Sequence, residues 1–418
     1  MKELDIALVA VGLLVLGTGL LSRPMERFPI SKPLVALALG VALSPVALRL
    51  LDAAEWHPSR DTLVHETGRL TLAIALMGVA LRLPRMWMRD HWRPLSVALL
   101  LLMPLMWLAS SLLVRLVLGL EWPAALLIGA ILTPTDPVVA SSIVTGPFAK
   151  KTLPGRLRHM LSAESGANDG LVLPLVMIGI LALTKPAGEA VHEWLVSTLL
   201  REVGLGIVLG AALGYVAARA LTWATEHDEM EVPSLLAFTV ALAIVALGGA
   251  KLLGGSGVIA VFVAGIAFSM ASRSQDRHEE ERIQESFNLF FTLPAFVLLG
   301  LLLPWHEWMA LGWRGVLVVA LVLLLRRLPA VLLLRRALSP LRATRDALWY
   351  GWFGPLGVSA MLYAALAHER THLAEAWSVG TLAIAASVVV HGMTSGPFTR
   401  WYGRRDQEAD EEGEREKE

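Results

Sequence analysis

The ten residues LSAESGANDG (Leu161–Gly170) decide the fold of this chain. They place two carboxylates, Glu164 and Asp169, and the amide of Asn168 directly before the apolar run LVLPLVMIGILAL (Leu171–Leu183). That run is typical of a membrane-spanning helix, because it has the composition of the hydrocarbon core. A charge inside such a helix costs about 2.5–3.5 kcal/mol on insertion scales. These polar residues therefore indicate a binding site inside a membrane.

The composition of the whole chain agrees with a membrane protein. It has 418 residues, of which 55% are hydrophobic, and a mean hydropathy of +0.60, which soluble globular proteins do not sustain over this length. The formal net charge is zero, so no bulk field points to nucleic acid. Cysteine is absent, which excludes disulfides and cysteine-ligated metals. We expect neither a metal enzyme nor a cofactor.

Apolar runs long enough to cross the bilayer predict an all-α polytopic protein with about thirteen transmembrane helices. Basic residues cluster after the odd-numbered spans, as in Arg82, Arg85, Arg89 and Arg93 after the third. The positive-inside rule then places the N-terminus outside and the C-terminus in the cytoplasm. The expected spans are 5–21, 33–51, 65–82, 95–119, 123–144, 157–184, 195–222, 234–252, 256–271, 285–303, 312–335, 345–367 and 377–401.

The loops between these spans are short, so residues 1–403 form one membrane domain. Residues 404–418 are rich in charge, and we expect them to be a disordered, solvated tail. The short loops and the absence of a targeting pattern favour the cytoplasmic (inner) membrane of a bacterium.

Two prolines flank an aspartate in the fifth span, ILTPTDPVVASSIV (Ile131–Val144). Pro134 and Pro137 have no N–H, so the carbonyls four residues before them lose their helical partners. Free carbonyls are tolerated at membrane depth only where they line a cavity. A broken helix with an oxygen-rich cation site is the prediction, and a proline kink that serves packing alone is the alternative. The oxygen-bearing side chains at the break are Thr133, Thr135 and Asp136.

The twelfth span, GWFGPLGVSAMLYAAL (Gly351–Leu366), is the second candidate for a broken helix. It contains Pro355 among three glycines and no acid. It lies seven spans after the fifth, so the two helices enter the membrane from opposite faces. Interrupted helices in corresponding positions of two inverted halves indicate the binding site of a transporter.

Helical spacing assigns different roles to the two acids. Glu164 and Asn168 are four residues apart and share a face, whereas Asp169 points about 140° away from Glu164. We expect Glu164 to pair with an arginine of the eleventh span, Arg327 or Arg326. The alternative for these arginines is that they extend to the cytoplasmic surface of the membrane.

Asp169 is expected near the middle of the membrane, about a dozen residues after the cytoplasmic Arg158. Removal from water disfavours the ionised form of a carboxylate. Such a group can hold a proton or a dehydrated monovalent cation, but not both. Competition for this one carboxylate is enough to couple two fluxes.

The motifs TDP, ESxxND and GxxGPxG together resemble those of monovalent cation:proton antiporters of the NhaP/NHE type. HGMTSGP (His391–Pro397) is similar to the closing motif of that family. The resemblance implies a homodimer of thirteen-helix protomers. It also implies a moving core, about 95–184 and 312–401, and a dimer scaffold, about 5–82 and 195–303.

The resemblance also implies roles for single residues. The ion-binding aspartate of the family falls on Asp169, and its unwound-helix aspartate falls on Asp136. Thr135 matches the threonine whose oxygens contact the ion, Asn168 the neutral member of the Asn-Asp pair, and Glu164 with Arg327 the structural ion pair. One position departs from the pattern. Leu356 occupies a site that is commonly basic in the family, which leaves open how the crossing of the two broken helices is neutralised. We interpret His391 as a capping or packing residue.

The expected function is secondary antiport of Na⁺, K⁺ or Li⁺ against H⁺ by alternating access. One cation is exchanged for one proton if Asp169 is the only exchanging group. The alternatives are a cation channel with an acidic constriction and an intramembrane aspartyl protease with Asp136 and Asp169 as its dyad. A symporter of organic anions would need a fixed positive group, and Leu356 removes the obvious one.

Overall fold

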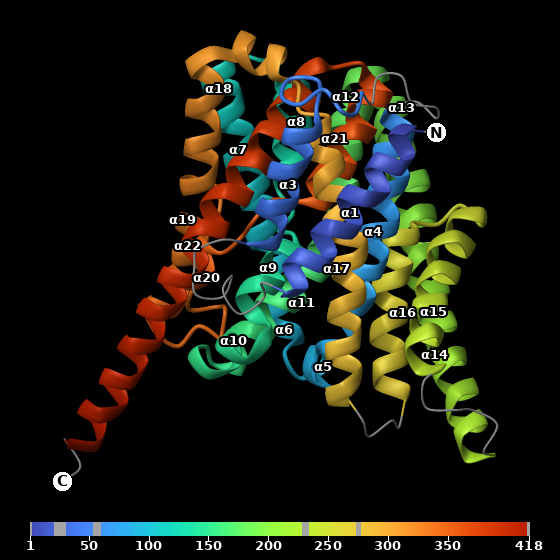
Figure 1. The fold of residues 1–418 in the computed structure, drawn as a ribbon, viewed down its shortest axis with the longest axis vertical. Coiled ribbons are helices and arrows are strands. Elements are labelled where there is room, and N and C mark those ends of the chain that lie inside the picture. Colours follow the sequence, from blue (N-terminus) through green and yellow to red (C-terminus); the bar gives the residue numbers. More distant parts are fainter. Residues whose placement is uncertain (1, 21–30, 53–59, 228–233, 273–276, 416–418) are drawn as a thin grey trace.

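The computed structural model describes residues 2–20, 31–52, 60–227, 234–272 and 277–415. Within these ranges every regular element is a helix. Most of the helices run side by side along the long axis of the molecule, and the C-terminal end of the last helix projects away from the bundle (Figure 1). By length and composition, six of the described helical segments could each cross a membrane, and the shorter apolar helices lie before or between them in sequence.

Every expected span contains helical structure in the described residues. Six spans are uninterrupted helices: α1 (Lys2–Leu20), α3 (Lys32–Leu43), α4 (Arg60–Arg82), α15 (Ser234–Leu252), α16 (Gly257–Ala271) and α17 (Arg277–Leu301). Two contain π-helical turns: α6 (Trp92–Val97), η2 (Ala98–Leu102) and α7 (Met103–Leu118) form the first, and η3 (Trp194–Gly204) and α14 (Leu205–Glu226) the second. The number of crossings and the orientation of the termini stay predictions.

The remaining spans are interrupted or unusually long. The interrupted ones are α8 (Trp122–Ile131) with α9 (Pro137–Val144), α11 (Gly155–Leu171) with α12 (Leu173–Thr184), α18 (Trp305–Leu325) with α19 (Leu328–Leu334), and α20 (Thr344–Trp352) with α21 (Val358–Thr371). The last helix is α22 (Ala374–Arg415). The short helices α5 (Trp87–Asp90), α10 (Gly146–Thr152) and α13 (Ala187–Glu193) connect longer ones.

Three expectations about element boundaries need correction. The second span ends at Leu43 rather than residue 51, because the chain turns at Ser44, whose hydroxyl and N–H both bond to the carbonyl of Val41. The eleventh span is broken between α18 and α19 rather than continuous. Residues 404–415, expected to be disordered, continue α22 as helix, which agrees with their many Glu and Arg residues, both good helix formers. Residues 416–418 lie outside the described part of the chain.

Glycines bring α11 and α14 close to the same neighbour, α16. A methyl group added to Gly166 or Gly170 of α11 would press on the side chain of Phe262 or Ile259. Gly210 and Gly214 of α14 lie equally close to the backbone of α16, at Ala260 and Ala264. Small residues at four-residue spacing allow this close helix packing in membranes. One face of α11 is thereby held against α16. The polar residues Glu164 and Asn168 of α11 contact the interrupted helices instead.

Candidate functional site

Two interrupted helices cross at the centre of the site. The chain is non-helical at Thr133–Asp136, between α8 and α9, and again at Phe353–Gly357, between α20 and α21. Both breaks lie where the prolines predicted them. The two non-helical segments are joined by a hydrogen bond of 2.7 Å, in which the N–H of Asp136 donates to the carbonyl of Pro355. Four half-helix ends therefore meet at one place.

The carboxylate of Asp136 binds the amino ends of two of these half-helices. Its Oδ1 accepts a hydrogen bond of 3.0 Å from the N–H of Val139 in α9. Its Oδ2 accepts a second one from the N–H of Val358, the first residue of α21. A carboxylate at a helix N-terminus satisfies free N–H groups and opposes the positive end of the helix dipole. Asp136 does this for both helices at once.

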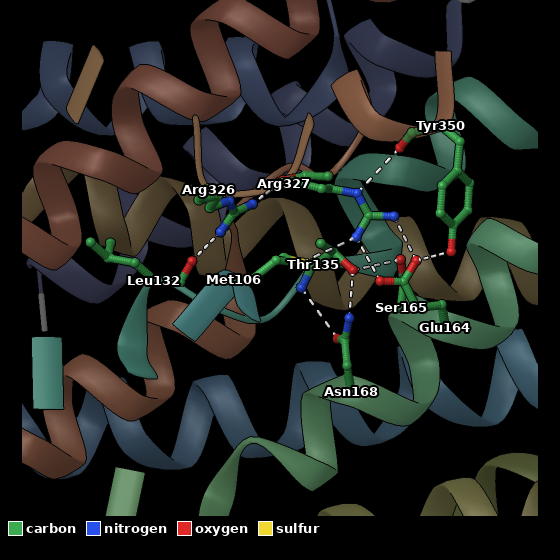
Figure 2. Close-up of polar contacts among 10 residues, drawn as sticks. Met106, Leu132, Thr135, Glu164, Ser165, Asn168, Arg326, Arg327 and Tyr350 are labelled. Carbon is green, nitrogen blue, oxygen red and sulfur yellow. Dashed lines mark hydrogen bonds and ion pairs between the residues drawn. The ribbon is translucent and has the colours of Figure 1, made fainter. Parts of the chain in front are cut away.

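The guanidinium of Arg326 binds the carboxyl ends of the other two half-helices. Its Nη1 donates to the carbonyl of Leu132 at the end of α8, as Figure 2 shows, and its Nη2 donates to the carbonyl of Gly354 just after α20. Arg326 is 2% exposed. It does not extend to a surface, so the alternative that these arginines reach the cytoplasmic surface is wrong for this residue.

A serine and a histidine of α22 support the same crossing. The N–H of Leu356 donates to Ser387 Oγ at 2.8 Å. His391 Nε2 lies 3.1 Å from the carbonyl of Trp352, the last residue of α20, and Nδ1 lies 3.0 Å from Ser387 Oγ. A neutral imidazole protonated on Nε2 satisfies both contacts, with the serine hydroxyl donating to Nδ1. This geometry agrees with the capping role expected for His391.

Glu164 forms a bidentate ion pair with Arg327, as Figure 2 shows. The Nη1–Oε1 and Nη2–Oε2 distances are both 2.6 Å. The hydroxyl of Tyr350 donates to Oε2 as well, and the carbonyl of Tyr350 accepts a bond of 3.2 Å from Arg327 Nε. Glu164 is 1% exposed and Arg327 is 2% exposed. The structure thus pairs Glu164 with Arg327, while the neighbouring Arg326 contacts the helix ends instead.

Asn168 connects α11 to the break between α8 and α9. Its Oδ1 accepts a bond of 3.2 Å from the N–H of Thr135, and its Nδ2 donates to Thr135 Oγ1 at 2.7 Å. Figure 2 shows the same hydroxyl beside Ser165, with 3.0 Å between the two oxygens. Thr133 is oriented differently, because its hydroxyl donates to the carbonyl of Gly129 at 2.7 Å. Of the two threonines at the break, only Thr135 is in this network.

Asp169 has a hydrogen-bond partner for its backbone carbonyl but not for its side chain. Its carbonyl accepts a hydrogen bond of 2.7 Å from the hydroxyl of Tyr363. The side chain is fully buried, and in the part of the chain that the structure describes neither carboxylate oxygen has a hydrogen-bond partner. The buried hydroxyl of Ser359, on the first turn of α21, also has no hydrogen-bond partner among the described residues. Buried polar groups of this kind require a ligand, a proton or water.

A cavity of about 330 Å³ lies beside Tyr363, whose hydroxyl bonds to the carbonyl of Asp169. Tyr363 and Leu173 are among its lining residues, so it comes next to the residues that hold Asp169. Its lining also includes charged residues, namely Arg201, Glu202, Lys251 and Arg370. The cavity therefore offers a polar approach to one side of the site.

Several of these residues were missed by the sequence reasoning. Ser165 lies four residues before Asp169 in α11, a spacing that could have identified it. Ser387 and His391 are also four residues apart on one helix. Tyr350 carried no such signal, because its contact with Glu164 joins positions 186 residues apart in the chain.

Comparisons with known proteins place the chain among ion exchangers. Residues 11–401 match the model of the family described as "Sodium/hydrogen exchanger, transmembrane". The chain is 33% identical, over 88% of its length and 49% of the relative's, to a Na⁺/H⁺ antiporter of Zygosaccharomyces rouxii. It is 26% identical, over 59% of its length and 41% of the relative's, to a K⁺/H⁺ antiporter of Shewanella oneidensis.

The fold is also similar to that of a solved structure, the sodium proton antiporter of Methanocaldococcus jannaschii. The TM-score is 0.74 at 20% sequence identity, and the match covers 95% of this chain and 98% of the other. The chain spans about half the length of three curated relatives that it matches.

Proposed function

Because the chain belongs to the sodium/hydrogen exchanger family, we propose that it is a secondary antiporter of a monovalent cation and H⁺. The family consists of transporters, so the reaction is translocation across a membrane and not a chemical conversion. The cation is Na⁺, K⁺ or Li⁺, and the relatives include antiporters of Na⁺ and of K⁺. No cofactor is needed, since both ions are substrates.

One observation carries the proposal more than any other. Asp169 has a fully buried carboxylate whose two oxygens have no hydrogen-bond partner among the described residues. An isolated buried charge is strongly unfavourable, so the group must bind either a proton or a cation. The two ligands compete, and the exchange of one for the other on opposite sides of the membrane couples their fluxes. One cation then moves against one proton.

The surrounding oxygens supply the rest of the proposed site. Monovalent cations prefer carboxylate, hydroxyl, amide and carbonyl oxygens, as hard cations do in general. Thr135 and Asn168 are proposed to contact the ion or to hold the residues that do. Asp136 contributes negative charge near Asp169. Thr133 has the weakest support in this set, because its hydroxyl is already bonded to Gly129.

The two alternative functions have no support. The relatives are antiporters rather than channels or proteases. A protease dyad also requires two carboxylates that share a proton, whereas Asp136 accepts N–H groups from the backbone of two helices.

The chain is a multi-pass membrane protein. Its finer location, the cytoplasmic membrane of a bacterium, is part of the proposal, as are the orientation of the termini and a homodimeric state. The homodimer, with a core that moves against a dimer scaffold, rests on the family resemblance.

Proton flux in inside-out vesicles with an imposed pH gradient tests the function. Na⁺, K⁺ and Li⁺ are added one at a time to the unchanged chain, to Asp169→Asn and to Glu189→Gln, an exposed control in α13. We expect at least one cation to collapse the gradient with the unchanged chain and the control, and none with Asp169→Asn. The proposal is wrong if no cation moves protons, or if Asp169→Asn still exchanges them.

A further inference from the structure

Adjacent arginines at the break between α18 and α19 point to different partners. Arg327 binds Glu164, and Arg326 binds the carbonyls of Leu132 and Gly354. On one continuous helix, successive side chains diverge by only about 100°. Here Pro329 stands in the first turn of α19, and the helix is interrupted at the two arginines. The break allows one arginine to reach the helix crossing and the other to reach α11.

The electrostatics of the crossing show why a cation is needed there. Helix C-termini carry free carbonyls and partial negative charge, and N-termini carry the opposite. Asp136 contacts two amino ends, and Arg326 contacts two carboxyl ends. The residue of the crossing itself that could have carried a positive charge is Leu356, which is fully buried and apolar.

We propose that Arg326 supplies the positive charge that fixes the crossing of the two interrupted helices, from a third broken helix and in place of a basic side chain at Leu356. It is a positioning residue, because it acts on the helix ends and touches neither Asp169 nor, by this proposal, the transported ion. Its two partners are the carbonyls of Leu132 and Gly354, which a residue within the crossing segments would otherwise have to satisfy.

A count of charges around the site gives this assignment a functional consequence, which rests on the proposed function. Glu164 is matched by Arg327 at 2.6 Å. Asp136 and Arg326 contribute one charge of each sign at the four helix ends. Asp169 is then left without a counter-charge among the residues described around the crossing. The proton or cation that it binds supplies that charge, in agreement with one-for-one exchange.

The test compares charge-removing and charge-keeping variants of Arg326. Arg326→Gln, Arg326→Lys and the double variant Arg326→Gln/Leu356→Arg are purified in detergent for thermal unfolding and reconstituted for cation-dependent proton flux. Arg314→Gln is the matched control, since Arg314 is exposed on the same helix, α18. We expect Arg326→Gln to unfold at a lower temperature and to exchange at least about tenfold more slowly, because two buried carbonyls lose a charged donor.

The charge-keeping variants decide between charge and shape. Arg326→Lys is expected to retain most of the exchange, and Leu356→Arg is expected to restore part of what Arg326→Gln loses. The proposal is overturned if Arg326→Gln matches the unchanged chain in both measurements, or if Arg326→Lys is as impaired as Arg326→Gln. If even the unchanged chain shows no exchange, the proposed function fails, while the unfolding temperatures still test Arg326.

Discussion

The two carboxylates of α11 differ in how the protein satisfies them. Glu164 accepts hydrogen bonds from both terminal nitrogens of Arg327 and from the hydroxyl of Tyr350. Asp169, five residues later, has none in the described part of the chain. A carboxylate whose bonds are complete stabilises one arrangement of helices, whereas an incomplete one is free to bind a ligand. Substitutions at the two positions should therefore affect different properties.

Glu164→Gln should destabilise the protein, and Asp169→Asn should not. Removing one member of a buried ion pair leaves the other charge uncompensated, at a cost of about 3–5 kcal/mol. The unfolding temperature of Glu164→Gln in detergent should fall well below that of Asp169→Asn and of the exposed control Glu189→Gln. Double substitution of Glu164 and Arg327 should cost less than the sum of the single ones, because the two side chains are coupled. Additive effects would show that the pair is not a unit.

At the scale of elements, local rules predict some breaks in the helices and not others. A proline removes an N–H from its own helix, so the breaks beside Pro137 and Pro355 follow from the sequence alone. Pro329 is equally compatible with the first turn of a new helix or with a kink, and the break at Arg326 was missed. The partner of Glu164 stayed undecided between Arg326 and Arg327, because that choice depends on where the chain is interrupted.

The charge balance of the crossing could not be predicted from the sequence either, because it also depends on the tertiary structure. The substitution of an apolar Leu356 at a commonly basic position was visible in the sequence. Its compensation by Arg326 requires the tertiary fold, since the contact with Leu132 joins residues 194 positions apart. The π-helical turns of η2 and η3 were likewise not predicted from the sequence. Geometry at these positions comes from packing, which spacing does not encode.

Gly357→Ala tests how tightly the crossing is packed. The backbone of Gly357 is extended, so its conformation suits any residue, but an added methyl group would collide with the carboxylate of Asp136. The collision would disrupt the hydrogen bond that the N–H of Val358 donates to Asp136 and would separate the two breaks. Exchange should be lost and unfolding should occur at a lower temperature. Gly248→Ala is the control, because nothing lies within 4 Å of its added methyl group. Equal behaviour of the two variants would contradict a tight crossing.

At the scale of the whole molecule, the cavity beside Tyr363 is expected to be the route from the outer surface to Asp169. The chain has no cysteine, so a single introduced thiol reports directly on access. Ser197→Cys lies in the cavity lining, and Ser339→Cys is exposed in the loop after α19, at the expected cytoplasmic side. A membrane-impermeant thiol reagent added to whole cells should modify Ser197→Cys and slow exchange, and should leave Ser339→Cys unmodified.

In inside-out vesicles the reagent should modify Ser339→Cys and leave Ser197→Cys unmodified. Modification of Ser197→Cys from the cytoplasmic side alone would invert the proposed orientation, and no modification from either side would exclude the cavity as an aqueous route.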